Sequence, residues 1–148
     1  MMIRNSRLLP VAFTVLLLSA CAGSNMPAYT APAMSGTWKD IGTIANNNIV
    51  VAYETGSVQR TGDQARLRDR KIVVNPAKEA YIGTPRYKVA VSDWEFHCKN
   101  RSYRIAVVRY LDESGKHLRE DRFSATAIRH MPLTVGTIAE KQFKIACK

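Results

Sequence analysis

The sequence predicts an α+β fold that is mostly β: an antiparallel meander sheet with a short C-terminal helix and one disulfide. Short apolar or alternating segments, separated by turn residues, dominate between Trp38 and Ala125, and this pattern is typical of strands. Strands do not alternate with helices as they do in a parallel sheet, so consecutive strands should pair as antiparallel neighbours. A helical pattern begins only at Thr137.

The first half of the predicted sheet contains three strands. Residues 38–44 and 49–53 are short apolar segments, and the Asn46-Asn47-Asn48 run between them suits a turn. A second turn is expected over residues 58–63. The next strand starts at Gln64 and continues until Asn75-Pro76 stops it.

The second half of the sheet is expected to continue in the same way. A long strand runs over residues 87–96, and a turn at 99–102 leads into another strand over 103–110. Residues 112–116 form a hairpin loop, because Asp, Ser and Gly favour turns. A last strand is expected near residues 118–125.

The C-terminal segment carries a helix-start signal. Thr137-Ile138-Ala139-Glu140 matches the capping box, in which a hydroxyl and a carboxylate satisfy the first free amides of a helix. The residues expected on or beside its packing side are Ile138, Gln142, Phe143, Ala146 and Cys147. We therefore expect this short helix to pack on the sheet.

A row of basic residues is the candidate binding patch. In the strand that starts at Gln64, period-two alternation places Arg66, Arg68 and Arg70 on one face and Ala65 and Leu67 on the other. The full candidate patch is Arg66, Arg68, Arg70 and Lys71, extended by Arg86 and Lys88 if their strand is the neighbour. The alternative is a solvated strand face whose charges keep an edge from pairing with another chain.

Residues 1–20 are predicted to be a lipoprotein signal peptide. Arg4 and Arg7 form a basic head, and the apolar core at 8–18 is shorter than the roughly 20 residues that a membrane-spanning helix needs. Leu18-Ser19-Ala20-Cys21 resembles the bacterial lipobox, which predicts lipidation of Cys21 and anchoring in a membrane. The alternative is a cleaved secretory peptide followed by an incidental cysteine.

The predicted mature chain has two parts. Residues 21–36 are small, polar and uncharged, and we expect them to be the lipidated N-terminus and a flexible tether. Residues 37–148 have the length of one domain. Ala22 after the lipidated cysteine favours the outer membrane over the inner membrane, while the side that the domain faces stays open.

The net charge of the chain favours acidic partners. The whole chain has a net charge of +10, and loss of Arg4 and Arg7 leaves 20 basic against 12 acidic residues, a net +8. Such an excess favours lipid head groups, acidic polysaccharide, nucleic acid or acidic protein surfaces, and it does not choose among them. Besides the membrane reached through the lipid, we expect a protein or polysaccharide partner and no nucleic acid.

Cys98 and Cys147 are the two cysteines that remain after lipidation. In an oxidising compartment an even pair predicts a disulfide. The alternative is a metal site in which Cys98 joins His97, His117 and His130, but no spacing typical of metal ligands occurs. We therefore expect no metal and no other cofactor.

No catalytic motif occurs in the sequence. Ser57 lacks the Gly-Xaa-Ser-Xaa-Gly context of a nucleophile, and Asp112 and Glu113 belong to the expected hairpin loop. The glycines are scattered and form no phosphate-binding loop. The sequence therefore predicts a protein that is not an enzyme.

Residues 38–147 resemble the surface-adhesin protein E family of Gram-negative lipoproteins. The matching features are Trp38, Tyr53-Glu54, the stretch 56–63, Phe96-His97-Cys98-Lys99, Arg101, the hairpin 110–115, Pro132 and Cys147. The sequence departs from the family at Glu54, where Asp is common, at His97, where an acidic residue is usual, and near Ala127-Ile128, which replaces an aromatic residue.

The resemblance implies an antiparallel sheet with a C-terminal helix and joined cysteines. It also implies a surface adhesin that binds host matrix proteins such as vitronectin and laminin and that can form a homodimer. No local motif carries the family's binding residues over to this chain. The alternative function is a structural or accessory subunit of an envelope assembly that faces the periplasm.

Overall fold

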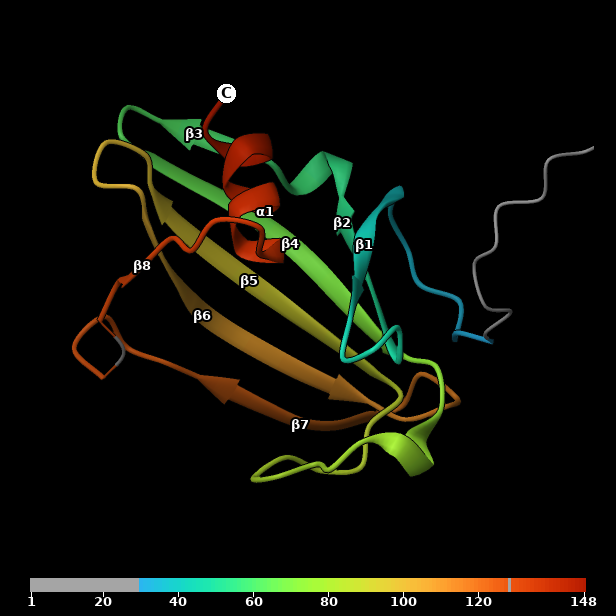
Figure 1. The fold of residues 1–148 in the computed structure, drawn as a ribbon. Helices are drawn as coiled ribbons and strands as arrows, with labels where there is room; N and C mark the ends of the chain where they lie inside the picture. The colour runs from blue at the N-terminus through green and yellow to red at the C-terminus, as the bar shows by residue number, and fades with distance from the viewer. Residues whose placement is uncertain (1–29, 128) are drawn as a thin grey trace, which may run out of the picture.

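The computed structural model describes residues 30–127 and 129–148 (Figure 1). The predicted signal peptide, the lipidation site Cys21 and the predicted tether up to residue 29 lie outside the described residues. Within the described part of the chain, no helix has the length and apolar character needed to cross a bilayer.

The strands form one antiparallel sheet whose main path is a meander in chain order. The strands of this path are β1 (Trp38–Ile44), β2 (Ile49–Glu54), β4 (Gln64–Val73), β5 (Val89–His97), β6 (Ser102–Leu111) and β7 (His117–Arg122). Two short strands lie off it: β3 (Gln59–Thr61) pairs with β4, and β8 (Met131–Pro132) pairs with β6. The predicted fold class is confirmed.

Several short elements differ from the prediction. The expected turn over 58–63 contains β3, and only Gly62-Asp63 turns the chain. A 3-10 helix, η1 (Thr55–Ser57), precedes β3, and another, η2 (Pro76–Lys78), follows β4. Sequence reasoning missed β3 and β8 because strands of three and two residues are too short to display an alternating pattern.

Helix α1 (Ile138–Ala146) begins at the predicted capping signal. The Thr137 hydroxyl accepts a hydrogen bond from the Glu140 amide at 3.3 Å. The Glu140 carboxylate accepts one from the Gly136 amide at 2.8 Å, one residue before the cap. Both contacts satisfy amides at the helix start, which would otherwise lack partners.

The helix lies across one face of the sheet and completes the main core (Figure 1). Its contacts are with aromatic and aliphatic side chains of β4 and β5, and the buried cluster is Ala65, Leu67, Trp94, Phe96, Ala139, Phe143 and Ala146. The Cys98–Cys147 disulfide joins the end of β5 to the end of the helix, which confirms the predicted pairing.

Candidate binding surface

Arg66, Arg68 and Arg70 share the sheet face opposite the helix, which we call the arginine face. Leu67 and Asp69, which alternate with them in β4, are buried at 2% and 0% exposure on the other face, the helix face. The arginine face contains all three arginines of the predicted row. It is therefore the candidate binding surface.

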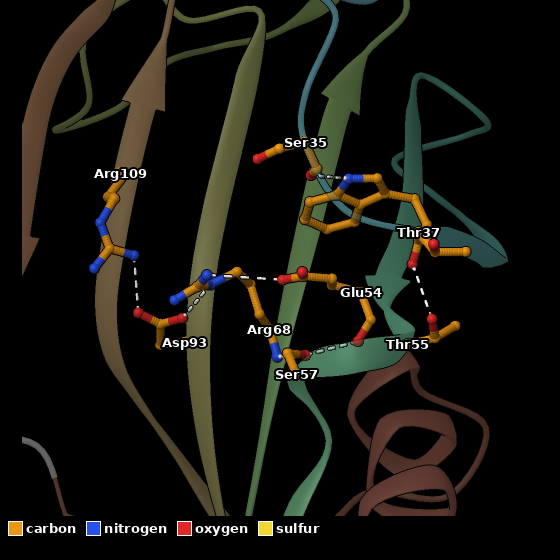
Figure 2. Close-up of polar contacts among 9 residues, drawn as sticks. Ser35, Thr37, Glu54, Thr55, Ser57, Arg68, Asp93 and Arg109 are labelled. Atoms are coloured by element: carbon orange, nitrogen blue, oxygen red, sulfur yellow. Dashed lines mark hydrogen bonds and ion pairs between the residues drawn. The ribbon is translucent and has the colours of Figure 1, made fainter.

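A line of alternating acids and arginines crosses this face from β2 to β7. Its members are Glu54, Arg68, Asp93, Arg109, Glu120 and Arg122, and Figure 2 shows the first four. Arg68 Nε lies 2.7 Å from Asp93 Oδ1, and Arg109 Nη1 lies 2.8 Å from Asp93 Oδ2. With equal numbers of each sign, this line carries no net charge.

Asp93 is the central acid of this line. Burial alone would raise the pKa of its carboxyl, but the hydrogen bonds and positive charges of Arg68 and Arg109 outweigh burial and hold the pKa below its ordinary value. Asp93 therefore stays ionised at neutral pH and keeps both guanidinium groups in place. The line is a fixed surface and not a set of independent charges.

Replacing Asp93 by asparagine is expected to remove an acid-sensitive part of the stability. Because the folded pKa is depressed, the stabilisation is complete above the unfolded pKa of about 4 and is lost as the pH falls through the folded pKa. Urea unfolding of both proteins across this range measures it. The difference in urea midpoint between wild type and variant should shrink as the pH falls. If it stays constant down to the lowest pH at which both proteins fold, the role assigned to Asp93 is contradicted.

A second, shorter line contains Arg66. Glu95 on β5 forms ion pairs with Arg104 on β6 and with Arg66, whose Nη2 lies 3.3 Å from Glu95 Oε1. The Arg104 side chain is 12% exposed and the Arg66 side chain 69% exposed. One acid therefore faces two arginines, and Arg66 is the guanidinium of this line that solvent or a partner can reach.

Arg70 makes a different contact. Its guanidinium carbon lies 4.7 Å from the centre of the Trp38 ring, in cation–π geometry. Among the described residues Arg70 forms no ion pair, and its buried Nε has no hydrogen-bond partner. Arg70 therefore brings a positive charge that no acid of the described residues neutralises.

Lys71 does not extend the arginine row. Neighbouring residues of a strand point to opposite faces, so Lys71 shares the helix face with Asp69. Its Nζ lies 2.7 Å from Asp69 Oδ2 and 5.1 Å from the centre of the Trp94 ring. Gln142 of the helix donates to the same carboxylate oxygen at 2.6 Å. Lys71 thus belongs to the contact between sheet and helix.

Arg86 and Lys88 also lie apart from the row. Lys88 is 8% exposed, and its Nζ donates to the Val74 carbonyl at 3.3 Å. Arg86 is exposed in the loop before β5 and lines a hollow with Asp112 and Glu113 of the β6–β7 hairpin. In β5 only residues 89–97 pair with β4, and Arg86 and Lys88 precede this segment. The row therefore consists of Arg66, Arg68 and Arg70 alone.

Two hollows lie on the arginine face and share Glu54 and Arg68. The first, which we call the Arg66 hollow, has a volume of about 470 Å³ and is bordered by Ser57, Gln59 and Arg66. The second, of about 420 Å³, is bordered by Met34, Trp38 and Leu111. Both have apolar as well as charged walls, a mixture that suits contact with another protein.

The histidines offer no metal centre. Cys98 is in the disulfide, and His117 is on β7. The rings of His97 and His130 are neighbours at 6.3 Å between centres. In the described residues no three His, Cys, Asp or Glu side chains gather as metal ligands would. The alternative of a Cys98-centred metal site is therefore incompatible with the observed disulfide.

A comparison with protein-family models decides the family. The model described as surface-adhesin protein E matches residues 38–148, three quarters of the chain. The chain belongs to the surface-adhesin protein E family. The matched region includes every strand, the helix and both disulfide cysteines.

Membership in the surface-adhesin protein E family supports an adhesin-like binding protein at the surface of the cell envelope. It implies a role in binding and not in catalysis. Comparisons with curated proteins and with solved structures give no match.

Proposed function

We propose that this protein is a lipid-anchored, non-enzymatic adhesin that binds a host extracellular-matrix protein through its arginine face. In this proposal residues 1–20 are removed, Cys21 carries the lipid, and the outer membrane holds the domain. The lipobox-like Leu18-Ser19-Ala20-Cys21 sequence and the family membership support the anchoring. The observation that carries the binding role is the pair of adjoining hollows on the arginine face.

The charge pattern favours a protein ligand over an acidic polysaccharide. A polysaccharide with closely spaced anionic groups needs a dense excess of cations. On the arginine face the long line is neutral, and Arg66 shares its acid with Arg104. Fixed charges of both signs beside apolar walls suit the mixed surface of a protein better.

Replacing Arg66 by serine is expected to weaken binding to immobilised vitronectin or laminin about tenfold, since it removes one exposed charge contact. Arg66 is 69% exposed, and Arg104 still holds Glu95, so the thermal midpoint should barely change. Surface plasmon resonance at two salt concentrations measures the effect. The salt dependence should decrease in the variant, because the removed contact is electrostatic.

Arg86→Ser is the matched control, because it removes the same charge from an exposed residue outside the row. The control should bind as wild type does. Equal weakening by the two substitutions would show a general charge effect and would contradict binding at the arginine face. A sulfated polysaccharide can be added as a competitor of the matrix protein. If it competes with wild type but not with the Arg66 variant, polysaccharide is the ligand of the arginine face.

Protease treatment of intact cells tests the proposed surface exposure. A surface adhesin is cut by external protease, whereas an accessory subunit that faces the periplasm is cut only after the outer membrane is permeabilised. Mass spectrometry of the purified mature protein tests the anchor. A mature N-terminus without an acyl adduct on Cys21 would contradict lipidation.

A further inference from the structure

The segment before β1 lies on the arginine face and is not detached from the domain. We call residues 31–37 the N-terminal strap. Ala31 and Met34 pack against a buried cluster formed by Ile72, Val89 and Val91. Pro32 lies against Gly115 of the β6–β7 hairpin: a Cβ added to Gly115 would be 3.2 Å from the Cβ of Pro32. The strap therefore covers the apolar end of the face.

The end of the strap is fixed beside the ion-pair line. Trp38 Nε1 donates to the Ser35 carbonyl at 3.0 Å, a contact drawn in Figure 2. Gly36 has a φ of +97°, and a Cβ there would lie 2.7 Å from Glu54 Oε1. Only glycine fits this turn, because other residues would be strained and would displace the Glu54 carboxylate.

The hollow of about 420 Å³ on this face lies between the strap and the sheet, and we call it the strap hollow. Its apolar lining residues are Met34 and Trp38, from the strap and the start of β1, and Val91 and Leu111, from β5 and β6. Its volume is within the roughly 300–1,000 Å³ of ligand pockets, and it accommodates a single large side chain. Its walls are mixed, because Ser35, Glu54, Arg68 and Arg109 line it beside these four apolar residues.

Positive charge lies next to these apolar residues. Arg68 and Arg109 border the hollow, and Arg70 lies under the Trp38 ring without an ion pair among the described residues. The acids that face them are Asp93, which both Arg68 and Arg109 share, Glu54 and Glu120. Arg70 does not line the hollow but lies against the Trp38 ring, so an acidic residue beside the bulky side chain of an occupant would be attracted to its unneutralised charge.

We propose that the strap hollow receives a bulky apolar side chain of the protein partner, flanked in the partner by acidic residues. The strap forms one wall of this site, so the segment that links the domain to its predicted lipid anchor is also part of the binding surface. This inference rests on the proposed function and names the chemistry of the partner segment. It also gives Trp38 a role as a contact residue.

Two labelled peptides test the proposal on the full chain in detergent: one has a phenylalanine between aspartates, and the other has asparagines in their place. Fluorescence anisotropy should show the aspartate peptide binding at least about tenfold more tightly, in line with a charge-assisted contact. Binding should change tryptophan emission. Trp38→Phe should abolish that change, because only Trp94, buried at 6% exposure, then remains.

Met34→Ala is expected to weaken the aspartate peptide about tenfold by removing an apolar wall. Ile82→Ala is the control, since Ile82 is 89% exposed in the loop before β5. The control variant should bind the peptide as wild type does. Equal affinity for both peptides, or normal binding by the Met34 variant, would overturn the proposal. So would an unchanged emission of Trp38.

The matrix-protein assay separates this proposal from the proposed function. If the Met34 variant binds matrix protein normally while the Arg66 variant does not, the strap site is refuted and the adhesin function stands. If wild-type protein binds no matrix protein, the proposed function fails. Displacement of the peptide by a sulfated heparin fragment, with equal peptide affinities, would instead assign the hollow to polysaccharide.

Discussion

Serine at both Cys98 and Cys147 is expected to lower the free energy of unfolding by about 4 kcal/mol, the largest loss that we predict for this protein. The disulfide joins residues 49 positions apart, and opening so long a loop increases the conformational freedom of the unfolded chain. Domains of this size are stable by only about 5–15 kcal/mol, so the variant should unfold at a much lower urea concentration.

The loss should also be visible in the native structure, because the bond fixes the end of α1 to the end of β5. Hydrogen exchange should become faster in the helix than in β5, which keeps its pairing with β4 and β6. Reductant should destabilise wild type to the level of the variant and leave the variant unchanged.

Cys21→Ser is the control for loss of a cysteine outside the disulfide-closed loop, and because it also removes the proposed lipid it is compared with wild type by its response to reductant and not by its absolute stability. Unfolding of the detergent-solubilised control should keep the wild-type dependence on reductant. A loss of less than about 1 kcal/mol in the double variant would mean that residual structure already restrains the reduced chain.

The long strands and the helix could be predicted because their patterns are local. Alternation along β4 separates Arg66 and Arg68 from Leu67, and a period of two is visible in ten consecutive residues. The capping box at Thr137 likewise needs only four residues. Predicting the disulfide required only the number of cysteines left after lipidation and the expectation of an oxidising compartment.

The electrostatic environment of the arginine row could not be predicted, because it depends on strand register. Arg68 meets Glu54 and Asp93, which lie on β2 and β5 and are distant in sequence. Sequence reasoning considered the arginines as an unneutralised patch and did not pair them with these acids. It also included Lys71, although the same alternation that defines the row assigns Lys71 to the other face.

The docked strap was missed for a different reason. Residues 31–36 are uncharged and, apart from Met34, small, a composition typical of a tether. Their packing depends on an apolar cluster on the sheet that becomes visible only when β4 and β5 pair. The signal in the sequence is Met34 and Trp38, two large apolar residues that a solvated linker does not need.

Replacing Lys71 by methionine is expected to lower the free energy of unfolding by about 3 kcal/mol, because removal of one partner leaves a buried charge poorly compensated. Asp69 is 0% exposed, and its Oδ2 accepts from Lys71 and Gln142. Its other oxygen has no hydrogen-bond partner among the described residues. Without the ammonium group, only the Gln142 amide remains to stabilise the carboxylate. Urea unfolding measures the loss.

Two further variants separate charge burial from other effects of the substitution. Adding Asp69→Asn to Lys71→Met should recover much of the loss, because the neutral amide needs no cationic partner. Lys99→Met, at an exposed residue after β5, removes the same charge and should leave stability within about 0.5 kcal/mol of wild type.

The Lys71 variant also tests which face binds the partner. Lys71 and Arg66 lie in the same strand, but Lys71 contacts the buried carboxylate under the helix while Arg66 is exposed on the arginine face. Arg66→Ser should therefore weaken binding with little loss of stability, and Lys71→Met should do the reverse. Weakened binding by a Lys71 variant that keeps wild-type stability would place the partner on the helix face, where the Lys71 side chain lies.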